Sequence, residues 1–122
     1  MSGIVERYLA TMTTHDWDDL RACLADDFTR IGPYGDVKSD QDVYVAFLSE
    51  LMPKFPSYAL EIHRVTYTGN LAFAELTESM EVEGKMRHTP EVLVIDLAPD
   101  GRISRVEIYI QRHGDPEEKR AW

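Results

Sequence analysis

The sequence has one cysteine, no long apolar run and few basic residues. With Cys23 as the single cysteine, an internal disulfide bond is excluded. No apolar run reaches roughly 18 residues, so no membrane-spanning helix is predicted. The charged pair Glu6 and Arg7 lies where a signal peptide needs an apolar stretch, so cytoplasm is the expected compartment. The net charge of −9, from 13 basic and 22 acidic residues, disfavours nucleic acid and anionic membranes as partners.

Motifs of the common cofactor-dependent enzymes are also missing. The sequence has no P-loop, no G-x-G-x-x-G, no HExxH and no G-x-S-x-G elbow. The histidines His15, His63, His88 and His113 are scattered, without the spacing of metal ligands. We therefore expect no cofactor and no metal. Any chemistry would come from carboxylates, a tyrosine or an arginine in an apolar cavity.

What the sequence does contain is a clear change of periodicity. Apolar residues at helical spacing predict a helix over residues 3–14, and Asp16 predicts the cap of a second, short helix. A capping pattern at 39–42 predicts a third helix that ends at Pro53, with Val43 on its buried face. After Pro56 the period becomes two, which predicts four strands in a meander. Helices followed by an antiparallel sheet indicate one α+β domain.

Two segments, ERYLATMTTHDWDDLRACLADDFTRIGPYGD and EGKMRHTPEVLVIDLAPDGRISRVEIYI, carry a family resemblance. They resemble the nuclear transport factor 2-like superfamily, in particular its SnoaL-like and ketosteroid-isomerase-like branches. The resemblance implies a cone-shaped α+β barrel, in which three N-terminal helices pack on a curved, mostly antiparallel sheet around a pocket. The domain is expected over residues 1–113, with a polar tail at 114–122.

The resemblance also implies which residues keep or lose the steroid-isomerase machinery. Tyr8 falls at the position of the oxyanion tyrosine. The general base falls on Gly32 and the second oxyanion donor falls on Leu93, so both groups are missing. Two supporting tyrosines fall on Leu24 and Leu48. Proton transfer between steroid carbons is therefore disfavoured.

Strand parity suggests replacements for the missing groups. On the strand after Asn70, Glu78 is the one acid on the apolar face, where burial should raise its pKa. Glu91 shares the parity of the pocket-facing Leu93, and a bulge at Pro90 would turn His88 inward as a proton shuttle. The predicted catalytic residues are Glu78, Tyr8, Arg30, Glu91 and His88. The predicted substrate-binding residues are Met12, Trp17, Tyr34, Phe47, Met52, Leu76, Met80, Leu93, Val106 and Ile108.

Each catalytic candidate also has a purely structural interpretation. Tyr8 lies on an apolar helical stripe, which is typical of a core tyrosine with a bonded hydroxyl. Glu78 could pair with Arg30 in a buried bridge, because an isolated buried charge is costly. Glu91 is interpreted as half-solvated at a strand end, and His88 as a surface residue.

Two functions follow from these observations. The first is a cofactor-independent isomerase, cyclase or dehydratase that acts on a hydrophobic carbonyl compound. The second is a non-catalytic ligand-binding or dimerisation domain of the same fold, and epoxide opening ranks last. Tyr67, Phe73 and Tyr109 are expected on the outer sheet face, which serves either as a homodimer interface or as an ordinary amphipathic surface.

Overall fold

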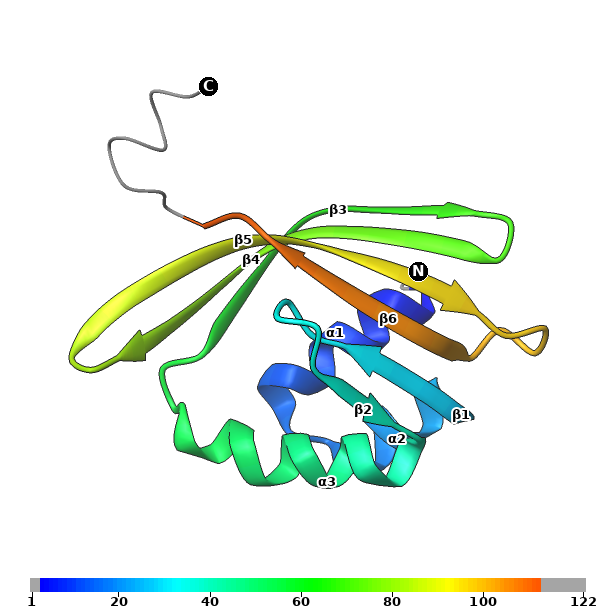
Figure 1. Cartoon of the computed structure of the whole chain (residues 1–122), viewed down its shortest axis with the longest axis horizontal. Coiled ribbons are helices and arrows are strands. Elements are labelled where there is room, and N and C mark those ends of the chain that lie inside the picture. The colour runs from blue at the N-terminus through cyan, green and yellow to red at the C-terminus, as the bar shows by residue number, and fades with distance from the viewer. Residues whose placement is uncertain (1–2, 113–122) are drawn as a thin grey trace.

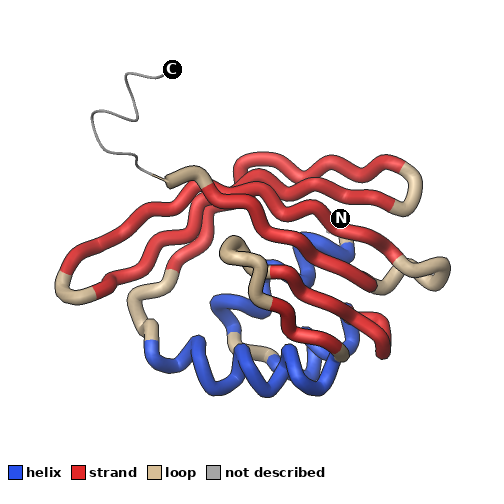
Figure 2. Tube along the Cα trace, viewed as in Figure 1, coloured by secondary structure: helices blue, strands red, loops and turns tan. Residues whose placement is uncertain are grey.

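A curved sheet of six strands covers three helices, and the two layers enclose the core (Figures 1 and 2). The computed structural model describes residues 3–112. The tail expected at residues 114–122 lies outside the described residues. Within residues 3–112, no helix has the length and apolar character that crossing a membrane requires.

The helices form where their caps and breakers predict. α1 spans Ile4–Thr14, α2 spans Trp17–Cys23 and α3 spans Gln41–Leu51. The Asp16 carboxylate caps α2 by accepting the backbone N–H of Asp19 at 3.0 Å. Asp40 caps α3 in the same way, within the predicted capping pattern. Pro53 ends α3, and the chain continues in a short 3-10 turn, η1, at Met52–Lys54.

The strands form the predicted meander and extend it by a hairpin. The strands are β1 (Leu24–Ile31), β2 (Val37–Ser39), β3 (Ala59–Thr68), β4 (Leu71–Val82), β5 (Lys85–Leu97) and β6 (Ile103–Ile110). Their order in the sheet is β2-β1-β6-β5-β4-β3, and every pairing is antiparallel except β1 with β6. The sheet is therefore mostly antiparallel, as predicted, and it stays open between β2 and β3. The parallel pairing brings the first hairpin beside the last strand (Figure 1).

The core lies between the concave face of the sheet and the helices. It combines inward residues of β4 and β5, such as Ala74 and Ile95, with Val5 of α1 and Leu20 of α2. Burial of this apolar surface is the main force that holds the two layers together. Cys23 is fully buried in the same cluster, as a packed thiol.

Two expectations about side-chain direction were wrong. Val43 was expected on the buried face of α3, yet it is 47% exposed and its neighbour Tyr44 is buried instead. Tyr67 was expected on the outer face, yet its hydroxyl accepts the Val5 N–H at 3.0 Å and donates to Glu6 at 2.5 Å, on the helix side. The register of β3 shifts between Ile62 and Arg64, which reverses the strand's parity beyond that point.

Candidate functional site

An elongated cavity of about 320 Å³ lies between the helices and the concave face of the sheet. Its volume is at the lower end of the range for small-molecule sites, about 300–1,000 Å³. Most of its wall is apolar: Leu9, Met12, Phe47, Leu48, Leu51, Met52, Phe55, Leu60, Leu76, Met80, Leu93 and Ile108. Its polar lining residues are Tyr8, Arg30, Tyr44, Tyr58, Glu78 and Glu91.

Two carboxyl groups lie together on the sheet wall of this cavity. The β4–β5 register pairs Leu76 with Glu91 and runs without a shift past Pro90, so Glu78 and Glu91 are diagonal neighbours on one face. Glu91 is only 7% exposed, which corrects its interpretation as a half-solvated residue. Burial, together with a hydrogen bond and the charge from Glu78, raises the pKa of Glu91 to about 10. Glu91 therefore keeps its proton at neutral pH.

Tyr58 holds the second carboxyl in position. Its hydroxyl donates to Glu78 Oε2 at 2.5 Å from the segment between η1 and β3. Burial and the adjacent Glu78 carboxylate raise the pKa of Tyr58, so the phenol keeps its proton as a donor. The alternative considered for Glu78, a bridge to Arg30, does not form, because Arg30 Nη1 instead donates to Asp36 Oδ2 at 2.7 Å.

A pair of tyrosine hydroxyls lies on the helix wall. The hydroxyl oxygens of Tyr8 on α1 and Tyr44 on α3 are 2.6 Å apart, and both side chains are almost fully buried. Burial raises the pKa of Tyr8 and raises the pKa of Tyr44 to about 12. Together the two hydroxyl groups carry two protons, and one of these protons forms the hydrogen bond between them. The other proton can be donated to an oxygen atom of a ligand.

Several predicted site residues lie in the cavity wall, and four do not. Met12, Phe47, Met52, Leu76, Met80, Leu93 and Ile108 line it, as do Tyr8, Arg30, Glu78 and Glu91. His88 is exposed on the outer face and hydrogen-bonds the Ser79 hydroxyl through Nδ1 at 2.7 Å. The interpretation of His88 as a surface residue is confirmed, because the β4–β5 pairing has no bulge at Pro90 that would turn it inward.

The other three corrections concern substrate-binding predictions. Tyr34 is 78% exposed at the β1–β2 turn, away from the cavity wall. Trp17 stacks on His15 at the start of α2, with ring centroids 5.2 Å apart. Val106 shares the parity of Ile108 but pairs with Ile95 and is fully buried in the core.

Sequence reasoning missed two of the six polar lining residues, Tyr44 and Tyr58. Tyr44 precedes Leu48 by four residues on α3, so helical spacing alone could have placed both on one face. Tyr58 gave no such signal, because it precedes β3. Its approach to Glu78 depends on the β3–β4 register, which pairs Leu60 with Glu78.

A metal site needs several ligand side chains grouped around one point. Among residues 3–112, no three His, Cys, Asp or Glu side chains are grouped so that they could hold a metal ion. The polar groups of the cavity are instead hydrogen-bond donors and acceptors: three phenols, one guanidinium and two carboxyls. Such a set can bind an oxygen-bearing organic molecule and move a proton on it.

Comparison with known proteins identifies the family. The model of the SnoaL-like domain matches residues 5–106, and the chain therefore belongs to the SnoaL-like family of the nuclear transport factor 2-like superfamily. A search of curated proteins finds no match.

Solved structures share this fold at low sequence identity. A candidate SnoaL-like polyketide cyclase from Shewanella denitrificans is 14% identical, with a TM-score of 0.80 over 98% of this chain and 96% of the other. An epoxide hydrolase of the LEH-like type from M. tuberculosis is 20% identical, with a TM-score of 0.79 over 88% and 80%. A ketosteroid isomerase-like protein from Catenulispora acidiphila, in complex with trimethylamine, is 15% identical, with a TM-score of 0.77 over 87% and 83%. At these identities the likeness establishes the fold alone.

Proposed function

We propose that this protein is a cofactor-independent enzyme that moves a proton on a hydrophobic carbonyl compound, in an isomerisation, cyclisation or dehydration. The observation that supports it is the pairing of Glu78 with Glu91 inside an apolar cavity, where burial and the neighbouring Glu78 raise the pKa of Glu91 to about 10. A carboxylate and a neutral carboxyl in one site supply a general base and a general acid at the same pH.

The groups divide into two roles. Glu78, positioned by the Tyr58 hydroxyl, takes a proton from the carbon next to the substrate carbonyl. The electron pair of that C–H bond moves into the carbonyl, and negative charge develops on its oxygen. The Tyr8–Tyr44 pair donates a hydrogen bond to this oxygen. In an isomerisation, Glu78 then returns this proton to another atom of the substrate and Glu91 keeps its own proton. In a dehydration, Glu91 gives its proton to the leaving hydroxyl group, which departs as water, and Glu91 is reprotonated by the proton that Glu78 removed.

Hydrogen–deuterium exchange tests this proposal whatever the final product of the reaction is. A panel of small hydrophobic ketones is incubated with the protein in D₂O, and deuterium uptake next to the carbonyl is followed by mass spectrometry. We expect at least one ketone to exchange faster with the protein than without it, and Glu78→Gln to abolish that gain. Glu81→Gln is the matched control, because Glu81 is exposed on the opposite face of β4. Exchange by Glu78→Gln at the wild-type rate would remove Glu78 from the mechanism.

The alternative is a binding domain without catalysis, and the apolar lining of the cavity favours it. The similar protein from Catenulispora acidiphila was solved with trimethylamine, which makes a small-molecule occupant reasonable for this fold. The exchange experiment separates the two functions. Saturable binding of a ketone with no gain in exchange supports the binding domain and rejects the enzyme.

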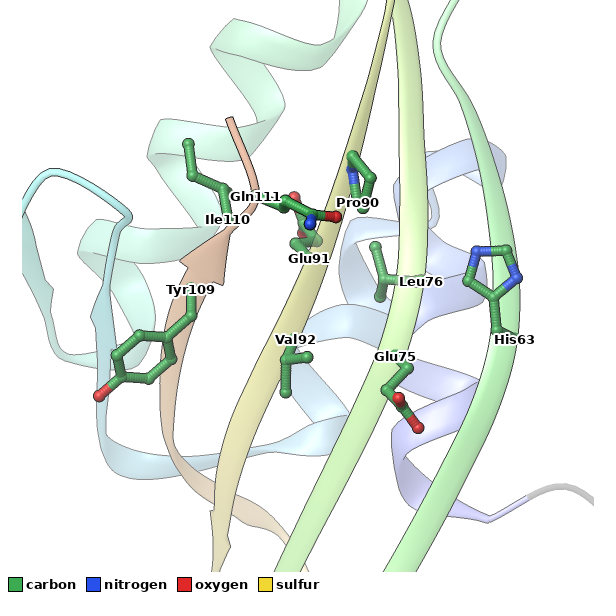
Figure 3. A pocket seen from close by; sticks show the side chains of 9 residues that line it. All are labelled: His63, Glu75, Leu76, Pro90, Glu91, Val92, Tyr109, Ile110 and Gln111. Atoms are coloured by element: carbon green, nitrogen blue, oxygen red, sulfur yellow. The ribbon is translucent and has the colours of Figure 1, made fainter. Parts of the chain in front are cut away.

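We also propose that a second copy of the chain covers the outer face of the sheet. A groove of about 470 Å³ lies there. Figure 3 shows three of its lining residues, Glu75, Val92 and Tyr109, on neighbouring strands with the helices behind them. The charges on this face pair with one another, for example Arg105 with Glu107, so two copies of an acidic protein can meet there with little repulsion. Tyr109 is 55% exposed and provides an apolar contact.

Sedimentation equilibrium tests this association. We expect a dimer for the wild type and a monomer for Tyr109→Glu, which places a charge in the proposed interface. Val43→Glu is the control, because Val43 is similarly exposed but lies on α3 in the helical layer. A wild type that sediments as a monomer, or a Tyr109→Glu variant that stays dimeric, would contradict the proposal.

A further inference from the structure

We infer that Arg30 and Lys38 form a carboxylate-binding rim at one end of the cavity, so that the molecule bound there carries an acidic group as well as an apolar body. The assignment of this molecule as the substrate rests on the proposed function, whereas the rim itself rests on the geometry of β1, β2 and α3. Together, the rim and the proposed function define the substrate class as a hydrophobic carbonyl compound that carries a carboxylate, such as a keto acid.

Two cations converge on one aromatic ring. Arg30 and Lys38 are direct neighbours in the β1–β2 register. The Arg30 guanidinium carbon is 5.5 Å from the centroid of the Phe47 ring, and Lys38 Nζ is 4.9 Å from the same centroid. Arg30 and Phe47 line the cavity, and Lys38 reaches it through its contact with the Phe47 ring. Like charges held this close repel each other, and cation–π contact with the ring offsets only part of that cost.

The acidic residues nearby leave this arrangement with a net positive charge. Asp36 accepts a hydrogen bond from Arg30, and both Arg30 and Lys38 lower the pKa of Asp36. Lys38 has no carboxylate within ion-pairing distance among residues 3–112. Two cations and one carboxylate leave one positive charge, in a protein whose net charge is −9. A ligand carboxylate would neutralise it.

Arg30 has hydrogen-bonding capacity to spare. Its side chain is only 15% exposed, and within the described part of the chain its one side-chain hydrogen bond goes to Asp36. A guanidinium has five N–H donors in a planar fork that fits a carboxylate. Gly32 makes room for the ion pair, because a Cβ there would lie 2.3 Å from Asp36 Oδ1 and 2.6 Å from Arg30 Nη1. Position 32 is where the general base of the steroid isomerases falls in the resemblance. In this protein, the glycine at that position leaves space for the largely buried Arg30 guanidinium instead.

The cavity wall carries both acidic and basic side chains. The Glu78 and Glu91 carboxyl groups lie on the sheet wall, whereas Arg30 and Lys38 lie beside the Phe47 ring of α3. A carboxylate is attracted to the rim and repelled by the carboxyl pair, which orients a keto acid with its carbonyl part directed inward. A neutral ketone would have no such preference for one orientation.

Equilibrium binding tests the rim independently of catalysis. Calorimetry compares 4-phenylbutyrate with its neutral counterpart 4-phenylbutanamide, for the wild type and three variants. We expect the wild type to prefer the acid, with a preference that decreases as salt is added.

Lys38→Met should weaken acid binding by about fivefold and leave amide binding unchanged, as loss of one partly exposed charge implies. Asp36→Asn should strengthen acid binding, because it removes the competing carboxylate from Arg30. Lys85→Met on the exposed β4–β5 hairpin is the control and should match the wild type.

The opposite signs of the two rim variants distinguish a carboxylate site from simple damage to the fold. The rim would be overturned by any of three results: the wild type fails to bind the acid, it binds acid and amide equally well, or Lys38→Met weakens the binding of both compounds equally. Deuterium exchange of a phenyl keto acid and of its methyl ester is measured alongside. If acid preference is present but neither compound exchanges, the rim stands and the proposed function fails. If the two compounds exchange equally well and the acid preference is absent, the function stands and the rim fails.

Discussion

Replacement of Glu91 by glutamine should make the stability of the protein less dependent on pH. Burial first, and then Glu78, raises the pKa of this carboxyl from 4.5 to about 10. Between these values the folded state holds a proton that the unfolded chain releases, so the free energy of unfolding falls as pH rises. The slope approaches about 1 kcal/mol per pH unit, so the loss from pH 6 to pH 8 approaches about 2–3 kcal/mol. That is a large share of a typical total of about 5–15 kcal/mol.

Urea unfolding at pH 6, 7 and 8 measures this effect. Glutamine keeps the shape and a hydrogen-bond donor toward Glu78 but has no proton to lose in this range. We therefore expect the free energy of unfolding of Glu91→Gln to fall less steeply with pH than that of the wild type. Glu81→Gln, at an exposed position on β4, should keep the wild-type slope. Equal slopes for the wild type and Glu91→Gln would show that Glu91 titrates alike in the folded and unfolded states, and would refute the reasoning.

Three further predictions concern the packing around the site. Gly32→Ala should lower the free energy of unfolding by about 1 kcal/mol, since the added methyl group displaces the partly exposed Asp36 carboxylate from Arg30; wild-type stability in urea would contradict the contact. Tyr44→Phe removes the hydroxyl partner of Tyr8 and should cost about 1 kcal/mol in the same assay, with no loss expected if the two hydroxyls do not bond. Cys23 is fully buried and burial raises the pKa of its thiol, so a thiol reagent should modify it only as the protein unfolds; rapid modification of the folded protein would show an open path to it.

Periodicity and parity predicted much of the fold and the position of the carboxyl pair. The helical stripe of α1, the Asp16 cap and Pro53 are local signals, and local signals decide where these helices begin and end. Glu78 and Glu91 could be placed on the inner face because β4 and β5 pair without a register shift from Leu71 to Val82. Simple alternation is reliable over such a regular ladder.

The remaining features depend on contacts between distant segments. The register shift in β3 reversed the direction of Tyr67, and no residue type in that strand announces it. Tyr58 meets Glu78 across 20 positions of the chain, and the parallel pairing of β1 with β6 joins segments still farther apart. The Arg30–Asp36 ion pair replaced the alternative bridge to Glu78, because the hairpin turn brings Asp36 within reach first.

Carbon-13 NMR of the glutamate side chains tests the central claim, that Glu91 keeps its proton inside the cavity at neutral pH. Uniform labelling of glutamate, with Glu78→Gln and Glu91→Gln for assignment, follows the carboxyl carbons from pH 5 to pH 9. We predict that the carboxyl carbon of Glu91 keeps the chemical shift of a protonated acid through pH 7. A carbon that reports full ionisation by pH 6, as an exposed glutamate does, would contradict the account.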